Sequence, residues 1–244
     1  MKILKNQGTF EVLSKSDDII GAIARSARTC CQSQDKASPE NDIKLVKNLI
    51  TRGHGAMLEF ADMTVRFDNC SRGFTHEMIR HRLCSFAQES TRYVDEKEFE
   101  FIVPPHRDET EKVEVSDYET MYIPVENWLQ VNSNVYRELR DIGWKPEDAR
   151  QVLPNALKSE IVVKADMREW RHIFDMRTSE FAHWEIRKVM VDLLKWSKQN
   201  IPLIFDDFFV YEKNGIEYGH KVMSKFNLQK EIEFYNMANP NDKI

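Results

Sequence analysis

The sequence alternates between short strand patterns and longer helical patterns, and this alternation is what most constrains its fold. Apolar and polar residues alternate over residues 61–67 and 99–103, which predicts two strands. A further strand is expected over residues 160–164. Apolar residues recur at helical spacing over residues 16–27, 42–52, 73–83, 116–142 and 179–199. We therefore expect an α+β fold that is rich in helix. Because the chain has no linker, repeat or low-complexity tract, we expect one domain over residues 1–244.

Capping and turn residues predict where several elements begin and end. Ser16 is the expected N-cap of the first helix, and Pro202 follows the end of the last long one. Pro146 is expected at the first position of a short helix, because its missing N–H has no intrahelical partner there. Asn214 and Gly215 together predict a hairpin turn between two strands.

Composition and charge exclude several classes of protein. The chain is 41% hydrophobic and 31% charged with a formal net charge of −5, so a dedicated nucleic-acid binder, which is usually basic, is not expected. No window approaches the roughly 20 apolar residues that span a membrane, and no signal peptide is predicted. The four cysteines lack metal-binding spacing, which predicts reduced thiols, a cytoplasmic protein and no metal site. The eight glycines form no GxGxxG or Walker pattern, so neither a Rossmann nor a P-loop site is expected.

Residues 80–93 concentrate side chains that bind phosphate. Arg80, His81 and Arg82 are consecutive, so on a helix they would point about 100° apart and fan outward. That arrangement suits the capture of a multiply charged anion, with Ser90 following closely. The alternative interpretation is a solvated basic helix face that is paired with neighbouring glutamates.

Other segments accompany this run in a fixed order. They are Gly53-His54-Gly55 with Glu59-Phe60, Ser71-Arg72, His76 to Arg82, Ala149 to Pro154, Arg168 to Arg177, and Ala182 to Arg187. In that order they resemble the GHxSxxEH, SR, RHR-seven-residues-Ser, ARxxLP, RxxxxFxxxR and AxxEIR elements of the flavin-dependent thymidylate synthases. The resemblance runs from about Gly53 to Phe208. The Arg-His-Arg element alone is moderately specific, whereas the ordered set is strongly specific.

The resemblance implies the reductive methylation of dUMP at C5, which yields dTMP. Methylenetetrahydrofolate would donate the carbon, FAD would carry the hydride, and NADPH would be the reductant. The family assembles as a homotetramer with FAD between subunits, and we expect the same here, with no nucleic-acid or membrane partner. No cysteine would act as nucleophile, because the family activates uracil electrostatically. Cys84, inside the motif, is expected to be a buried small apolar residue.

The resemblance also implies roles for individual residues of this chain. The implied catalytic residues are Arg177, which would stabilise the uracil anion, Ser90 and His54. The implied FAD-binding residues are Arg80, His81, Arg82, Gln88, Asp166, Arg168 and His172. The implied dUMP-binding residues are Glu77, Arg80, Gln88, Ser90, Arg92, Arg150 and Arg177. Arg150 would reach the phosphate, and in the family its equivalent comes from a neighbouring subunit.

Two positions depart from the family pattern, and two alternative functions remain open. Ala56 stands where serine or threonine is usual, and Asp166 stands where asparagine is common, so contacts to the flavin are expected to differ there. One alternative is a related enzyme that modifies another pyrimidine nucleotide or installs a hydroxymethyl group. The other is a nucleic-acid-binding module that uses the Arg-His-Arg patch, against which the acidic charge balance weighs.

Overall fold

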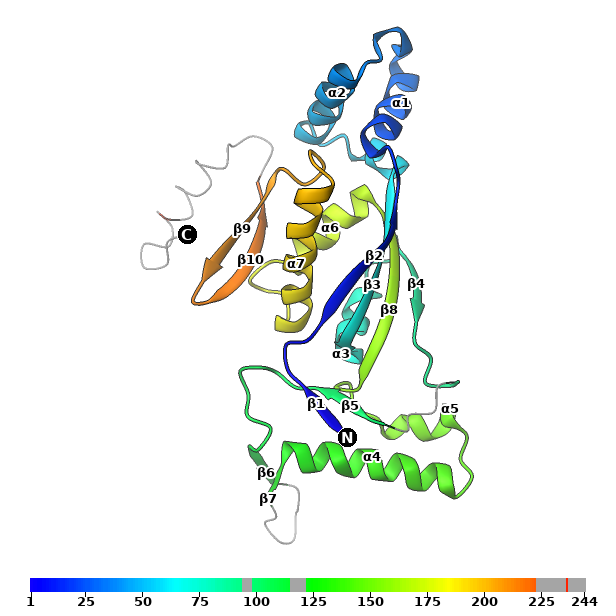
Figure 1. Cartoon of the computed structure of the whole chain (residues 1–244), viewed down its shortest axis with the longest axis vertical. Helices are drawn as coiled ribbons and strands as arrows, with labels where there is room; N and C mark the ends of the chain where they lie inside the picture. Colours follow the sequence, from blue (N-terminus) through cyan, green and yellow to red (C-terminus); the bar gives the residue numbers. More distant parts are fainter. Residues whose placement is uncertain (94–97, 115–121, 223–235, 237–244) are drawn as a thin grey trace. The chain divides into compact units, whose positions relative to one another are not determined.

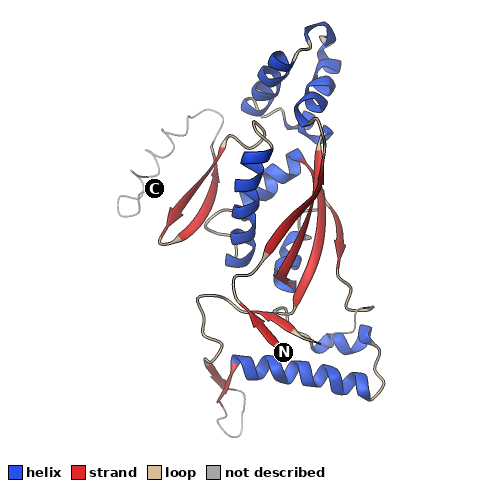
Figure 2. Ribbon diagram, viewed as in Figure 1, coloured by secondary structure: helices blue, strands red, loops and turns tan. Residues whose placement is uncertain are grey.

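The computed structural model describes residues 1–93, 98–114, 122–222 and 236 (Figure 1). Helices and strands are mixed along the chain, as the sequence predicts (Figure 2). The chain divides into two compact units: unit 1 is Met1–Thr9, Arg66–Arg80 and Phe86–Val162, and unit 2 is Phe10–Val65, His81–Ser85 and Val163–Ile244. This division leaves the single-domain expectation untested. Among the described residues, no helix combines the length and the apolar character that crossing a membrane requires.

A four-stranded sheet has the strand order β2-β3-β8-β4. Its strands are β2 (Thr9–Lys15), β3 (Asp62–Ser71), β8 (Lys158–Asp166) and β4 (Ser85–Gln88). The strands predicted over residues 61–67 and 160–164 are thereby confirmed. In β3 the side chains of Met63, Val65 and Phe67 are fully buried, whereas those between them are half-buried, so the alternation in sequence reflects one buried face.

Unit 1 has an aromatic core under a long helix. Strand β5 (Glu100–Ile102) pairs in parallel with β1 (Lys2–Leu4), and Phe99 and Phe101 on either side of Glu100 are fully buried. Helix α4 (Val125–Asp141) contributes Leu129 and Tyr136 to the same core, and the rings of Phe99 and Tyr136 meet edge-on at 5.4 Å. Helices α3 (Arg72–Met78) and α5 (Pro146–Ala149) and the pair β6 (Lys112–Glu114) with β7 (Tyr122–Pro124) belong to this unit.

Unit 2 is organised around helix α6 (Met167–Arg177). Figure 1 shows α6 and α7 (Trp184–Asn200) beside the hairpin of β9 (Phe208–Lys213) and β10 (Ile216–Lys221), and these elements are in contact. Phe174 of α6 meets Phe205 edge-on at 5.3 Å, and Trp170 Nε1 donates to the backbone oxygen of Met63 at 2.9 Å. Helices α1 (Ile19–Cys31) and α2 (Pro39–Thr51) contact each other and the 3₁₀ segment Gly55–Phe60. Helix α6 is therefore held along one buried face, through Trp170 and Phe174.

Several predicted helix starts are wrong, and local capping explains them. The first helix is capped by Asp18, whose carboxylate accepts from the Gly21 N–H at 2.9 Å. Ser16 instead accepts from the backbone N–H of Asp62 at 3.0 Å. Helix α2 begins at Pro39, behind the N-cap Ser38, and not near residue 42.

Two later helices are shorter than the sequence predicts. Helix α4 begins at Val125 with Pro124 as its N-cap, whereas its predicted start at residue 116 falls outside the described residues. Helix α7 begins at Trp184 and not at residue 179. The helix that begins at Pro146 and the hairpin turn are confirmed, and Asn214 and Gly215 have φ values of 55° and 74°, as that turn requires.

Asp166 begins helix α6. Its carboxylate accepts from the backbone N–H of Glu169 at 2.8 Å and so satisfies one of the unpaired donors of the first turn. A negative charge at this end also interacts favourably with the helix dipole.

Replacing Asp166 with alanine should lower the free energy of unfolding by about 1 kcal/mol, because the N-cap hydrogen bond is lost. Asp166→Asn keeps an acceptor of the same size and should cost much less. Urea unfolding of the flavin-free protein measures both variants. Equal losses in the two variants would contradict the capping role.

Candidate active site

The Arg-His-Arg run lies in a turn between α3 and β4. Helix α3 ends at Met78, and the backbone N–H of Arg80 donates to the Glu77 oxygen at 3.3 Å. The helix predicted through residue 83 is therefore wrong. The alternative interpretation of the run as a basic helix face is wrong for the same reason. Arg80 and Arg82 are exposed, whereas His81 is only 5% exposed. The turn thus separates the three side chains and buries the middle one.

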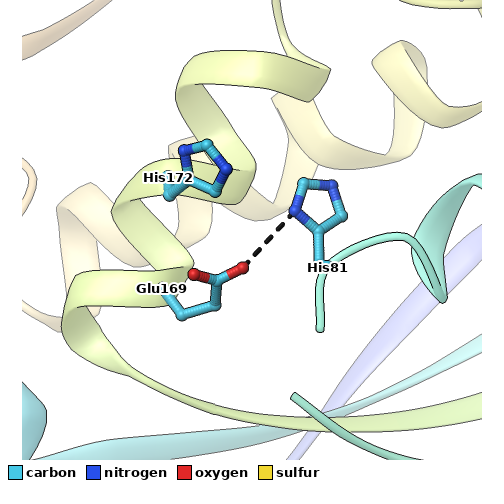
Figure 3. Close-up of side chains that lie close together, drawn as sticks. All are labelled: His81, Glu169 and His172. Carbon is cyan, nitrogen blue, oxygen red and sulfur yellow. Dashed lines mark ion pairs between the residues drawn. The ribbon is translucent and has the colours of Figure 1, made fainter. Parts of the chain in front are cut away.

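His81 meets three side chains of α6 within unit 2. The Nε of Arg177 donates to His81 Nε2 at 2.9 Å, and Glu169 Oε1 lies 3.5 Å from His81 Nδ1. The ring of His172 is edge-on to that of His81, with centroids 5.6 Å apart. Figure 3 shows His81 on a separate segment, facing Glu169 and His172 on their helix. The helical repeat brings these three α6 residues to one side of the helix.

His81 is neutral near physiological pH. Burial lowers its pKa from 6.5 to about 4, and the positive charges of Arg177 and His172 act in the same direction. Neutrality agrees with the geometry, because Nε2 must offer a lone pair to accept the Arg177 N–H. Burial also raises the pKa of the Glu169 carboxyl.

Cys84 lies near this cluster but lacks a reactive setting. Burial raises its pKa to about 12, and the negative charges of Glu169 and Asp166 act in the same direction. A thiol with so high a pKa is almost never a thiolate at neutral pH. Cys84 is half-buried, so the expectation of a buried residue is only partly met.

His81, Glu169 and His172 also have the spacing of a metal-binding group. One ligand atom of each lies within 4.8 Å of the others. A metal ion on His81 Nδ1 would move the ring proton to Nε2, where it would face the N–H of Arg177. The contact with Arg177 at 2.9 Å and a metal on Nδ1 therefore exclude each other.

A pocket of about 870 Å³ lies beside α6 in unit 2. Among its lining residues are Gly53, Gly55, Arg168, His172 and Lys221. Arg168 pairs with Glu59 at 2.6 Å, and a Cβ on Gly55 would lie only 3.2 Å from Arg168 Nε. A side chain at position 55 would thus require Arg168 to shift by a few tenths of an ångström. His54, exposed between the two glycines, flanks this pocket.

Unit 1 gathers Ser90, Arg92 and Arg150 around Glu147. Arg92 Nε donates to the Glu147 carboxylate at 3.2 Å, and Arg150 Nε donates to the Glu147 backbone oxygen at 3.1 Å. Arg150 Nη1 also donates to Thr91 Oγ1 at 3.2 Å, and Ser90 Oγ accepts from the Arg92 N–H at 3.3 Å. Two guanidinium groups of one chain are therefore close to a single acidic residue.

Comparisons with known proteins place the chain in a family. The family model described as thymidylate synthase complementing protein matches residues 11–203. A flavin-dependent thymidylate synthase of Geobacter sulfurreducens is 34% identical over 204 residues, which cover 80% of this chain and 84% of that protein. The one from Corynebacterium efficiens is 36% identical over 197 residues, which cover 76% and 78%. This chain belongs to the flavin-dependent thymidylate synthase family.

Solved structures show the same fold. Two structures of the UMP/dUMP methylase PolB from Streptomyces cacaoi, bound with 5-Br dUMP and 5-Br UMP, both match with a TM-score of 0.66. The identities are 22% and 23%, and the match covers 84% of this chain and 96% and 95% of those chains. At this identity the likeness concerns the fold, which is the mixed α and β arrangement predicted from the sequence.

The site residues implied by the resemblance fall into two groups in this family member. Unit 1 holds Glu77, Arg80, Gln88, Ser90, Arg92 and Arg150. Unit 2 holds His54, His81, Arg82, Asp166, Arg168, His172 and Arg177. Gln88 is oriented within unit 1, because its Nε2 donates to Thr75 Oγ1 at 2.8 Å and to Ser159 Oγ at 3.4 Å. The implied dUMP residues other than Arg177 thus share one unit.

Two acidic residues of the candidate site were not predicted from the sequence. Glu169 follows the N-cap of α6 by three positions, and Glu147 lies in the first turn of α5. Acidic residues are ordinary at both places because they suit the helix dipole. No sequence signal therefore distinguished the carboxylate beside His81 from an unremarkable first-turn residue.

Acidification should destabilise the fold through His81. Its folded pKa of about 4 lies below the ordinary 6.5, so the unfolded chain binds more protons between these values and stability falls as the pH drops from neutral towards 4. Between about pH 7 and pH 5, wild type should lose up to about 2 kcal/mol more unfolding free energy than His81→Gln. Urea unfolding of the flavin-free protein measures the difference. His76→Gln, at an exposed position, is the control, and identical pH profiles for wild type and His81→Gln would contradict the assignment.

Proposed function

We propose that this chain methylates dUMP at C5 to give dTMP, with FAD as redox cofactor, NADPH as reductant and methylenetetrahydrofolate as carbon donor. The observation that carries the proposal is the hydrogen bond from Arg177 to His81. The bond joins the Arg-His-Arg element, which holds His81, to the RxxxxFxxxR element, which ends at Arg177. His81 and Arg177 lie 96 positions apart in the sequence. Family membership and this contact support the same chemistry.

Arg177 would activate the uracil ring. C5 of uracil is a poor nucleophile, and it becomes electron-rich when the ring bears a negative charge after N3 loses its proton. A guanidinium is permanently charged and planar, so it can stabilise that anion along one edge. The contact with His81 fixes Arg177 before substrate arrives, and such preorganisation lowers the cost of reaching the transition state.

Arg92 would bind the phosphate of dUMP, and Arg150 would reach the phosphate that is bound by a neighbouring subunit. In this structure Arg92 contacts the Glu147 carboxylate and Arg150 contacts the Glu147 backbone oxygen, and a dianionic phosphate is a stronger partner for a guanidinium group than either of these. Ser90 lies beside Arg92 and would add a hydroxyl donor. We assign the remaining contacts to the nucleotide to Glu77, Arg80 and Gln88.

Several of the residues assigned to FAD lie in unit 2, and their chemistry suits a flavin. Arg168 and His172 line a pocket of about 870 Å³, a size that suits a large ligand, and they supply a cation and a flat ring. We assign FAD binding to Arg80, His81, Arg82, Gln88, Asp166, Arg168 and His172, and we place His54 at the face shared by flavin and folate. Bound FAD supplies the two reducing equivalents of the reaction. His81 is 5% exposed, so it would act mainly by holding Arg177.

We also propose a single functional domain that assembles as a homotetramer in a reducing, cytoplasmic compartment. Phe181 is 99% exposed and Leu83 is 74% exposed. Large apolar side chains that are this exposed in one chain favour burial in an interface with another subunit. All four cysteines are described and are free thiols, which supports the compartment. A monomeric mass for the flavin-loaded protein in analytical ultracentrifugation would contradict the tetramer.

A product assay tests the proposed function. Heating the purified protein should release FAD and not FMN, because the chain devotes several donors to the cofactor. With NADPH, methylenetetrahydrofolate and dUMP, the flavin-loaded protein should form dTMP, which chromatography identifies. UMP in a parallel reaction tests the alternative nucleotide, and a hydroxymethyl product tests the alternative chemistry. Flavin-loaded protein that yields no dTMP would sink the proposal.

Cys84→Ala should retain dTMP formation within roughly tenfold, a barrier change of about 1.4 kcal/mol. The reason is the pKa of about 12, which leaves almost no thiolate to attack C6 of uracil. Steady-state rates with saturating dUMP measure the effect, and Cys30→Ala, at an exposed position, is the control. Abolished turnover with dUMP binding preserved would refute the cysteine-free route.

Arg177→Lys should reduce methyl transfer by roughly a hundredfold or more, because lysine keeps the charge but loses the planar group and the Nε contact. Reduction of the flavin by NADPH should survive far better, since that half-reaction forms no uracil anion. Stopped-flow absorbance follows the flavin while dTMP is quantified in the same sample. Equal slowing of both half-reactions would show that Arg177 has a different role.

A further inference from the structure

Glu169 is a buried carboxylate that the proposed reaction does not use directly. Its side chain is 7% exposed, and the side chain of His81 beside it is 4% exposed. Burying a carboxylate costs free energy unless it has a partner, and burial raises the pKa of Glu169 accordingly. The facing atom is His81 Nδ1, which lies 3.5 Å from Oε1, a separation within ion-pair range and longer than an ordinary N–H···O hydrogen bond.

The contacts of His81 determine its tautomer. Arg177 Nε carries a hydrogen and donates to His81 Nε2 at 2.9 Å, so Nε2 must hold the lone pair. In a neutral imidazole the single proton is then on Nδ1, which is the nitrogen that faces Glu169. A carboxylate at this position favours the Nδ1–H tautomer, because its negative charge attracts that proton and it has none to donate. The three groups therefore form an ordered chain from Glu169 through His81 to Arg177.

We infer that Glu169 is a positioning residue for Arg177, which it orients by holding His81 as the Nδ1–H tautomer. This inference rests on the proposed role of Arg177 in activating uracil. In a catalytic triad a carboxylate orients a histidine toward a third residue. Here the third residue is an arginine, and the group that the histidine contacts is its guanidinium. With the other tautomer, Nε2–H and the Arg177 N–H would be two donors facing each other, and Arg177 would have to turn away.

Other charged groups near Glu169 do not replace it in this role. The charges of His172, Asp166 and Arg168 act on its carboxyl, but Asp166 is engaged in capping α6 and Arg168 pairs with Glu59. A divalent cation held by His81, Glu169 and His172 is the competing use of the same atoms. That cation would need the Nδ1 lone pair and would break the contact with Arg177. The positioning role therefore requires a proton on Nδ1, whereas a bound cation requires Nδ1 to carry none.

The test measures which nitrogen of the His81 ring carries the proton, in the whole flavin-loaded chain. Histidine labelled with ¹⁵N in the ring reports by NMR which nitrogen carries the proton, and a spectrum of His81→Gln assigns the signals. Wild type should show Nδ1–H, and Glu169→Gln should shift the ring towards Nε2–H or a mixture. Glu169→Asp keeps the charge and should restore part of the Nδ1–H population. Glu185→Gln removes another buried carboxylate of unit 2 and should leave the tautomer unchanged.

Kinetics test the consequence for Arg177. Glu169→Gln should lower kcat for dTMP formation roughly tenfold or more with a smaller change in KM for dUMP, since supporting residues of this kind commonly contribute that much. The double variant Glu169→Gln with Arg177→Lys should be no slower than Arg177→Lys alone, because both act through one chain of contacts. Additive losses would overturn the inference.

The tautomer measurement separates this inference from the proposed function. An Nε2–H ring in wild type, or a ring whose Nδ1 signal responds to stoichiometric Zn²⁺, would overturn the positioning role even if dTMP is formed. A ring that changes tautomer in Glu169→Gln supports the role of Glu169 even if the nucleotide proves to be another pyrimidine. Unaltered tautomer and unaltered kcat in a folded Glu169→Gln protein would also overturn it.

Discussion

The hydrogen bond between the guanidinium of Arg177 and the buried imidazole of His81 is the interaction on which the candidate site depends. It requires a neutral ring, and burial lowers the pKa of His81 to about 4 and so keeps it neutral. A charged ring could not accept the Arg177 N–H, because both its nitrogens would be donors. Loss of neutrality at this one residue would therefore release the side chain proposed to activate uracil.

Packing around α6 makes that contact possible. Asp166 determines where the helix begins, Trp170 ties it to β3 through the Met63 oxygen, and Phe174 holds its inner face against Phe205. Because the helix is fixed at its start and along its buried face, the positions of Glu169, His172 and Arg177 follow from the helical repeat. The chemistry of the site thus depends on a helix cap, a hydrogen bond to the backbone and an aromatic contact, none of which is made by Arg177 or His81.

Much of the fold could be predicted from local sequence patterns. The alternation in β3, the hairpin at Asn214 and Gly215, and the proline-initiated helix at Pro146 depend on neighbouring residues alone, and all three are confirmed. Helix starts were less predictable, because Asp18 competes with Ser16 as N-cap and only the folded chain gives Ser16 another partner, the backbone of Asp62. Helix α3 likewise ends before the Arg-His-Arg run, which no residue of that run signals.

The sequence by itself determined the family, since the ordered motifs are local strings of residues, and their residue types and spacings are visible in the sequence alone. It also determined which side chains carry charge, and hence that arginines must bind any phosphate in a chain without a glycine-rich loop. Only the tertiary structure decided that His81 is buried while Arg80 and Arg82 are exposed, and that Glu169 faces it. The physical reason is that burial and pKa depend on neighbours from distant segments, and residues 81 and 169 become neighbours only when α6 packs against the turn that follows α3.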